Sequence, residues 1–129
     1  MPFSLRYLHF DLSTGHEDDR WSLDAMASVS APQWPALQEE VCRVLGWLHA
    51  THPHTQGPAE EGGLWDVALH ASQERSQSID LHFDPASGRL HGQAQPGDVW
   101  RHSLSLTLSL EPGLAQAVCE AFGLTNDAV

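Results

Sequence analysis

Hydrophobic and polar residues alternate along six stretches of the chain, with the two-residue period of strands that bury one face. These stretches are residues 5–12, 20–30, 65–72, 78–84, 90–94 and 99–110. The clearest is the last, in which leucine alternates with serine or threonine from Leu104 to Leu110. The first two stretches are separated only by a short polar segment, so the pattern predicts an antiparallel hairpin there.

Two other segments have apolar residues three or four apart, the spacing of a helix with one buried face. The first predicted helix begins near Pro35, ends at residues 49–51 and has an apolar stripe of Leu37, Val41, Val44, Leu45 and Leu48. The second begins at Pro112, ends before Gly123 and has a stripe of Leu114, Val118, Ala121 and Phe122. Proline in the first turn and glycine after the last are typical helix boundaries.

The predicted order of elements is therefore ββαββββα, in a single domain spanning residues 1–129. Two helices cannot cover both faces of a sheet of this size. We therefore expect an α+β fold, a two-layer sandwich with a mostly antiparallel sheet and both helices packed on one face. Turns are expected at residues 74–77, 84–89 and 96–98, which would pair the strand at 65–72 with the strand at 78–84.

The charge balance narrows the classes of partner. The chain of 129 residues has 17 acidic and 6 basic side chains, all six of them arginine, and a formal net charge of −11. Six scattered arginines do not form the basic patch on which nucleic-acid binding depends, and anionic membrane surfaces are disfavoured for the same reason. A negative field of this size favours rapid encounter with a basic protein.

The chain has no feature typical of secretion or of a membrane span. Its first residues contain no basic segment followed by an apolar run, and no stretch approaches 18 apolar residues. The two cysteines, Cys42 and Cys119, fall in the helical patterns and are expected to be small buried or half-buried side chains. These features predict a cytoplasmic protein.

Histidine and aspartate recur at the polar positions of the expected sheet. If the strands at 65–72 and 78–84 pair, His70 lies opposite Asp80 or His82, and His9 lies on the same face of the sheet. Imidazole and carboxylate groups together can bind a divalent metal or act as acid and base. His9, His70, His82 and Asp80 are thus a candidate metal site, although a solvated sheet face also accounts for them.

A second candidate site lies at the end of the first predicted helix. His49 and His52 are three residues apart, and His54 follows directly. Three imidazoles in six residues can bind zinc, copper or nickel. Histidine at a helix C-terminus is also favoured by the helix dipole alone, which needs no metal.

Trp47 lies off the apolar stripe of the first helix, near Glu40 and Arg43. An exposed tryptophan is a typical anchor of a protein interface. Trp47, Glu40 and Arg43 are therefore candidate interaction residues, unless a loop covers the indole.

No phosphate-binding loop, dinucleotide fingerprint or nucleophile elbow occurs in the sequence, which favours a binding protein over an enzyme. We expect a small acidic binding or adaptor domain, in its sharpest form an inhibitor or immunity-type protein for a basic partner. A homodimer formed through the uncovered sheet face or Trp47 is expected. The alternatives are a metal-dependent enzyme that uses the sheet-face histidines, and a self-assembling structural protein. No cofactor is expected apart from that divalent metal.

Overall fold

The computed structural model describes residues 4–14 and 19–124 of the chain. The residues of the first polar turn that lie between these ranges are outside the described part. The elements run in the order β1 (Phe10–Ser13), β2 (Trp21–Ser30), η1 (Ala31–Gln33), α1 (Trp34–Thr51), η2 (Ala59–Glu61), β3 (Trp65–Ser76), β4 (Ile79–Asp84), β5 (Arg89–Ala94), β6 (Val99–Leu110) and α2 (Pro112–Ala121).

Four strands form one antiparallel sheet in the order β1-β2-β6-β3, and β4 pairs with β5 in a separate two-stranded ribbon. The register brings leucines together on one face, because Leu108 lies opposite both Leu23 of β2 and Val67 of β3. The predicted first hairpin is confirmed, since β1 pairs with β2. Strand β6, in which the alternation is strictest, lies between β2 and β3.

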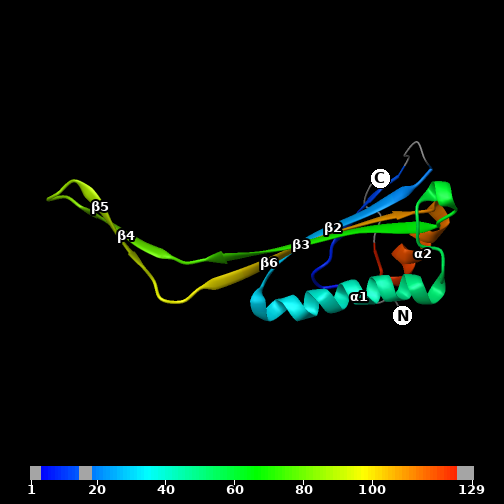
Figure 1. Ribbon diagram of the computed structural model, residues 1–129, viewed down its shortest axis with the longest axis horizontal. Helices are drawn as coiled ribbons and strands as arrows, with labels where there is room; N and C mark the ends of the chain where they lie inside the picture. The colour runs from blue at the N-terminus through cyan, green and yellow to red at the C-terminus, as the bar shows by residue number, and fades with distance from the viewer. Residues whose placement is uncertain (1–3, 15–18, 125–129) are drawn as a thin grey trace.

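Both helices pack on the same face of the four-stranded sheet, as Figure 1 shows. Leu37, Val44 and Leu48 of α1 are fully buried in the same core cluster as the leucines of β6. Leu114 and Val118 of α2 complete the core from the other end. The predicted α+β fold with two helices on one face is therefore confirmed. No helix in the described ranges is long and apolar enough to cross a membrane.

The helix boundaries follow local hydrogen-bond rules. Ser30 and Gln33 form a capping box that leads into α1. The Glu111 carboxylate accepts hydrogen bonds from the N–H groups of Gly113 and Leu114 at the start of α2, and these bonds hold the pKa of Glu111 below its usual value. Gly123 has φ of 64° and ends α2 in a Schellman arrangement.

One expectation about the sheet is wrong. Strand β3 does not turn at residues 74–77 but continues to Ser76, and its partner is β6 rather than β4. The segment 74–77 contains neither glycine nor proline, so nothing in it favours a reversal of the chain. The reversal comes at residues 84–89, where Pro85 and Gly88 form the turn between β4 and β5. The second half of the chain is therefore one long hairpin with a ribbon at its end.

Candidate functional site

The long hairpin projects well beyond the helices and the rest of the sheet, as Figure 1 shows. We call residues 68–101 the arm. No residue of the arm is buried, and all but Asp84 and Gln95 are exposed. Seven of the eight large hydrophobic side chains exposed in the described residues belong to it. These seven are Leu69, Ile79, Leu81, Phe83, Leu90, Val99 and Trp100.

The end of the arm has one wholly apolar side. In the ribbon of β4 and β5, Ile79 lies opposite Ala94, Leu81 opposite Gly92 and Phe83 opposite Leu90. Alternate residues of a strand point to the same side, so these six residues form one surface, which we call the tip face. Its four large side chains, Ile79, Leu81, Phe83 and Leu90, are 59% to 65% exposed. The opposite side of the ribbon carries Asp80, His82, His91 and Gln93.

The tip face is continuous because of its glycine. A Cβ atom placed at Gly92 would lie 3.0 Å from Leu81 Cδ2 and 3.2 Å from Ile79 Cγ2. Both side chains therefore lean across the bare glycine backbone, and a larger residue at that position would displace them.

The turn at the end of the ribbon is held by Asp84. Its carboxylate accepts hydrogen bonds from the Ala86 N–H at 3.0 Å and the Ser87 hydroxyl at 3.1 Å, which lower its pKa. Gly88, with φ of 69°, completes the reversal. The tip face is thus presented by a hairpin with a defined turn.

The arm differs from the rest of the chain in charge. It holds four acidic and three basic side chains, so it carries a formal charge of −1, and the remaining residues carry the other −10. Half of the chain's arginines, Arg75, Arg89 and Arg101, belong to the arm. A nearly neutral, partly apolar arm therefore projects from a strongly acidic body.

The proposed metal site on the sheet face does not form. His70 lies on β3 opposite Ser105 of β6, whereas His82 and Asp80 lie on β4 in the ribbon. His9 directly precedes β1, at the opposite edge of the sheet. The expectation failed because it paired β3 with β4. The His82 ring instead stacks on the ring of His91, with 5.4 Å between centroids.

The histidines at the end of α1 do not converge either. His49 lies edge-on to the Trp65 ring at 5.0 Å, and His52 Nδ1 lies 2.9 Å from the Thr51 hydroxyl. His54 follows in the left-handed conformation with φ of 63°. Across residues 4–14 and 19–124, no three histidine, cysteine, aspartate or glutamate side chains lie close enough together to hold a metal ion.

The three candidate interaction residues of α1 have different environments. Trp47 is half-buried against the core, with its ring edge-on to Phe122 at 6.0 Å, so it is not a freely exposed anchor. Glu40 is 5% exposed and its carboxylate accepts from the N–H groups of Arg6, Tyr7 and Leu8. Only Arg43 is exposed, in an ion pair with Glu39.

Glu40 is therefore a structural residue and not an interaction residue. Because Glu40 lies outside the apolar stripe of the helix, the sequence predicts it on the surface. In the structure, residues 6–8 of the N-terminal segment lie across that part of the helix and cover it. The cysteine prediction was also wrong in one case, because Cys42 is exposed. Cys119 is half-buried, and burial raises the pKa of its thiol.

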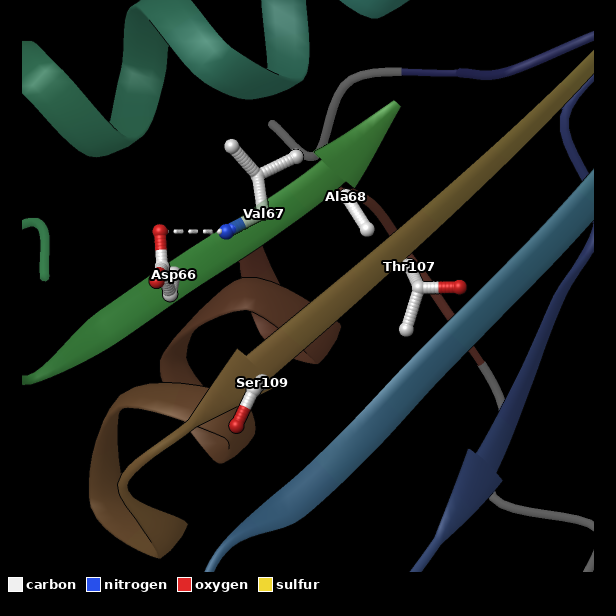
Figure 2. Close-up of a pocket in the computed structure, with 5 residues that line it drawn as sticks. All are labelled: Asp66, Val67, Ala68, Thr107 and Ser109. Carbon is white, nitrogen blue, oxygen red and sulfur yellow. Dashed lines mark hydrogen bonds between the residues drawn. The ribbon is translucent and has the colours of Figure 1, made fainter. Parts of the chain in front are cut away.

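The uncovered sheet face has a shallow depression, shown in Figure 2, of about 210 Å³. It is lined by side chains and backbone of β3 and β6: Asp66, Val67, Ala68, Thr107 and Ser109. The Asp66 carboxylate already accepts from the Val67 N–H at 2.9 Å. No imidazole among these lining residues could activate a hydroxyl, so the depression does not suggest a reaction.

The sequence contained a signal for the tip face that its interpretation missed. The alternation at residues 78–84 and 90–94 predicts strands that each bury one side. Period-two alternation shows that one side is apolar, but it does not show what covers that side. Comparisons of the chain with family models, curated proteins and solved structures gave no match. The function proposed below is therefore inferred from the fold and the arm.

Proposed function

We propose that the chain is a protein-binding domain that engages a basic partner protein, with the tip face inserted into an apolar groove of that partner. The observation that carries this proposal is the tip face itself, whose four large apolar side chains are all more than half exposed. The acidic composition also favours binding to a basic protein, and the arm is the part of the chain proposed to make the contact.

The physics of a two-stranded ribbon supports a partner at the tip. An isolated two-stranded hairpin is only marginally stable in water, and sheets normally bury an apolar side against another layer. Here neither helix reaches β4 or β5 (Figure 1). Apolar side chains gathered on an exposed surface are typical of an interaction site.

The charge distribution supports a basic partner. The body carries −10 and attracts a positively charged surface over several ångströms, which raises the association rate. The arm carries only −1, so little charge has to be desolvated when the tip face enters a groove. The body therefore steers the encounter, and the tip face supplies the apolar contact area.

The test begins with capture of partners from a lysate of the source cells by the tagged full chain, at about 50 mM and about 500 mM salt. Any captured protein is then purified and its affinity measured directly. Two variants are compared with the parent chain: Leu81→Ser with Phe83→Ser at the tip, and Met26→Ser as the control. Met26 is 79% exposed but lies on β2 in the body.

The expected result is a basic protein whose Kd rises at least about tenfold with the tip variant and stays unchanged with Met26→Ser. Its affinity should also weaken at the higher salt concentration. Equal binding by the tip variant contradicts the proposal, and so does an empty capture. A tip variant that instead changes the mass of the isolated chain shows that the tip face binds a second copy, which also overturns it.

A further inference from the structure

A second surface, separate from the tip face, is the open edge of the main sheet. Strand β3 is the last strand in the order β1-β2-β6-β3, so one side of its backbone has no neighbouring strand among residues 4–14 and 19–124. It is 12 residues long and contains no proline, glycine or lysine. Proline and lysine are among the residues that usually protect an exposed edge against pairing with another chain.

The hydrogen bonds at the start of β3 show which residues face the open edge. The Trp65 carbonyl accepts from the Gly57 N–H at 2.8 Å, on the side away from β6. Successive residues of a strand direct their N–H and C=O groups to alternate sides. The outward groups of β3 therefore belong to the odd-numbered residues, which agrees with the bond from the Val67 N–H to the Asp66 carboxylate.

The edge is open over a defined length. Gly57 covers the edge at Trp65, and the Asp66 carboxylate occupies the Val67 N–H. Beyond them, the backbone groups of Leu69, Ala71, Gln73 and Arg75 face outward, and none of them bonds to another described residue. The open edge therefore presents eight hydrogen-bonding groups over residues 69–75.

In one register, a second β3 strand pairs all eight outward groups of this edge. When two copies pair antiparallel about a two-fold axis through Ser72, Leu69 meets Arg75 and Ala71 meets Gln73, and each pair occurs twice. Each of these pairs exchanges two backbone hydrogen bonds, so all eight outward groups find partners. A register shifted by two residues toward the start of the strand would need the Val67 N–H that Asp66 already occupies.

The side chains favour the same register independently. It places His70 of each copy opposite Glu74 of the other, an attractive pair at both ends of the contact. On the other face, the Arg75 side chain lies over Leu69, which is 50% exposed in the single chain and would be covered by the aliphatic part of the arginine. At the centre Ser72 meets Ser72, two small residues without charge.

From the open edge and this register we infer that two copies of the chain pair through β3 to form one continuous eight-stranded antiparallel sheet. The contact is an isologous dimer, in which the same surface of each copy binds the other. Backbone pairing in this dimer ends at Arg75, so β4 and β5, which carry the tip face, take no part in it. The dimer contact and the proposed contact with a basic partner therefore use different strands and can be tested separately.

The test is a disulfide across the two-fold axis. In a Cys42→Ser background, which removes the exposed thiol, Ser72→Cys places two cysteines opposite each other. Their Cα atoms would be about 4.5 Å apart in a non-hydrogen-bonded pair, within the range that a disulfide spans. The control is Ser76→Cys, on the same side of the same strand, where the two copies would lie about 26 Å apart.

Under mild oxidation, Ser72→Cys should form a covalent dimer at least about tenfold faster than Ser76→Cys, because pairing raises the effective concentration of the thiols. Equal rates overturn the inference. Sedimentation of the unmodified chain should show a dimer, and a monomer at about 100 µM also overturns it.

A backbone variant gives a second, independent readout. Ala71→Pro removes an outward N–H and leaves the bonds to β6 in place, so the variant should fold and sediment as a monomer. In the unmodified dimer, the amides of Leu69, Gln73 and Arg75 should exchange at least about tenfold more slowly than in Ala71→Pro. A variant that remains a dimer, or outward amides that exchange equally fast, contradicts the β3 contact.

Discussion

Single residues hold the N-terminal segment on the body, and Glu40 is the main one. Its carboxylate lies against three consecutive backbone N–H groups, those of Arg6, Tyr7 and Leu8, at 2.8 to 3.1 Å. A buried carboxylate is retained only where such donors replace water. Leu8, which this contact fixes, is itself a fully buried core residue.

We therefore expect Glu40→Ala to lower the free energy of unfolding by about 2–3 kcal/mol, because three donors lose a charged acceptor. Urea unfolding followed by tryptophan fluorescence measures the loss. Glu39→Ala is the matched control, since its exposed pair with Arg43 should contribute about 0.5 kcal/mol or less. Equal effects of the two variants would mean that the Glu40 contacts do not stabilise the fold.

Glu111 gives a pH-dependent prediction. The pKa of its carboxyl is lowered in the folded chain by the N–H groups of Gly113 and Leu114. A lowered folded pKa stabilises the fold above the unfolded pKa, and this contribution is lost as the pH falls through the folded value. At pH 7, Glu111→Ala should cost about 1 kcal/mol.

Glu111→Gln keeps the side-chain acceptor but removes the charge. It should cost less than Glu111→Ala at pH 7, and its difference from the parent chain should shrink as the pH falls below about 4.5. Urea unfolding across that pH range is the measurement. A difference that persists unchanged in acid would show that the charge of Glu111 does not stabilise α2.

The sequence predicted burial correctly where buried residues recur with the spacing of a helix or strand. It failed where burial depends on contacts between residues far apart in the chain. The stripe of α1 is buried or half-buried as expected, at Leu37, Val44 and Leu48 above all. The role of Glu40 was missed, because only the folded chain brings residues 6–8 over the helix. No local pattern contains that information.

At the scale of elements, the long hairpin of β3 and β6 is well packed where it lies in the main sheet and unpacked where it continues into the arm. Leu106 and Leu108 of β6 are fully buried, whereas the large side chains of β4 and β5 are mostly exposed. The two ends of the same hairpin should therefore contribute very differently to stability, although both read as alternating strands.

We expect Leu106→Ala to cost about 3 kcal/mol, the usual effect of a cavity in a core. Leu81→Ser with Phe83→Ser should cost no more than about 1 kcal/mol, because these side chains leave water only slightly on folding of the single chain. Chemical unfolding of the isolated protein measures both. A tip variant as unstable as Leu106→Ala would mean that the tip face packs within its own chain and is not free for a partner.

The elements themselves were largely predictable from the sequence, but their partners were not. Six strands and two helices occur in the predicted order, and Pro112 and Gly123 bound α2 as expected. The pairing of β3 with β6 was missed because a turn was assumed at residues 74–77. Strand pairing depends on which apolar sides meet, as Trp65 with Leu110, and adjacency along the chain does not determine it.

At the scale of the whole molecule, the net charge of −11 acts oppositely on the two proposed contacts. Two copies of the chain repel each other, whereas a basic partner is attracted. Salt screens both effects, with a Debye length of about 10 Å at 0.1 M.

Raising the salt concentration from about 50 to about 500 mM should therefore strengthen the β3 dimer and weaken partner binding. Sedimentation of the isolated chain and titration with the purified partner measure the two trends. Trends of the same sign would contradict the assignment of one contact to a like-charged copy and the other to a basic protein.

The tip face is the proposed contact with the basic partner. Photo-crosslinking can locate that contact, with a benzophenone amino acid placed at Phe83 in one chain and at Met26 in another. Both side chains are exposed, but Phe83 lies on the tip face and Met26 on the uncovered face of the main sheet. Crosslinks to a basic protein from Phe83 and none from Met26 are the expected result. Crosslinks from Met26 alone would place the contact on the sheet face and rule out the tip face as the binding surface.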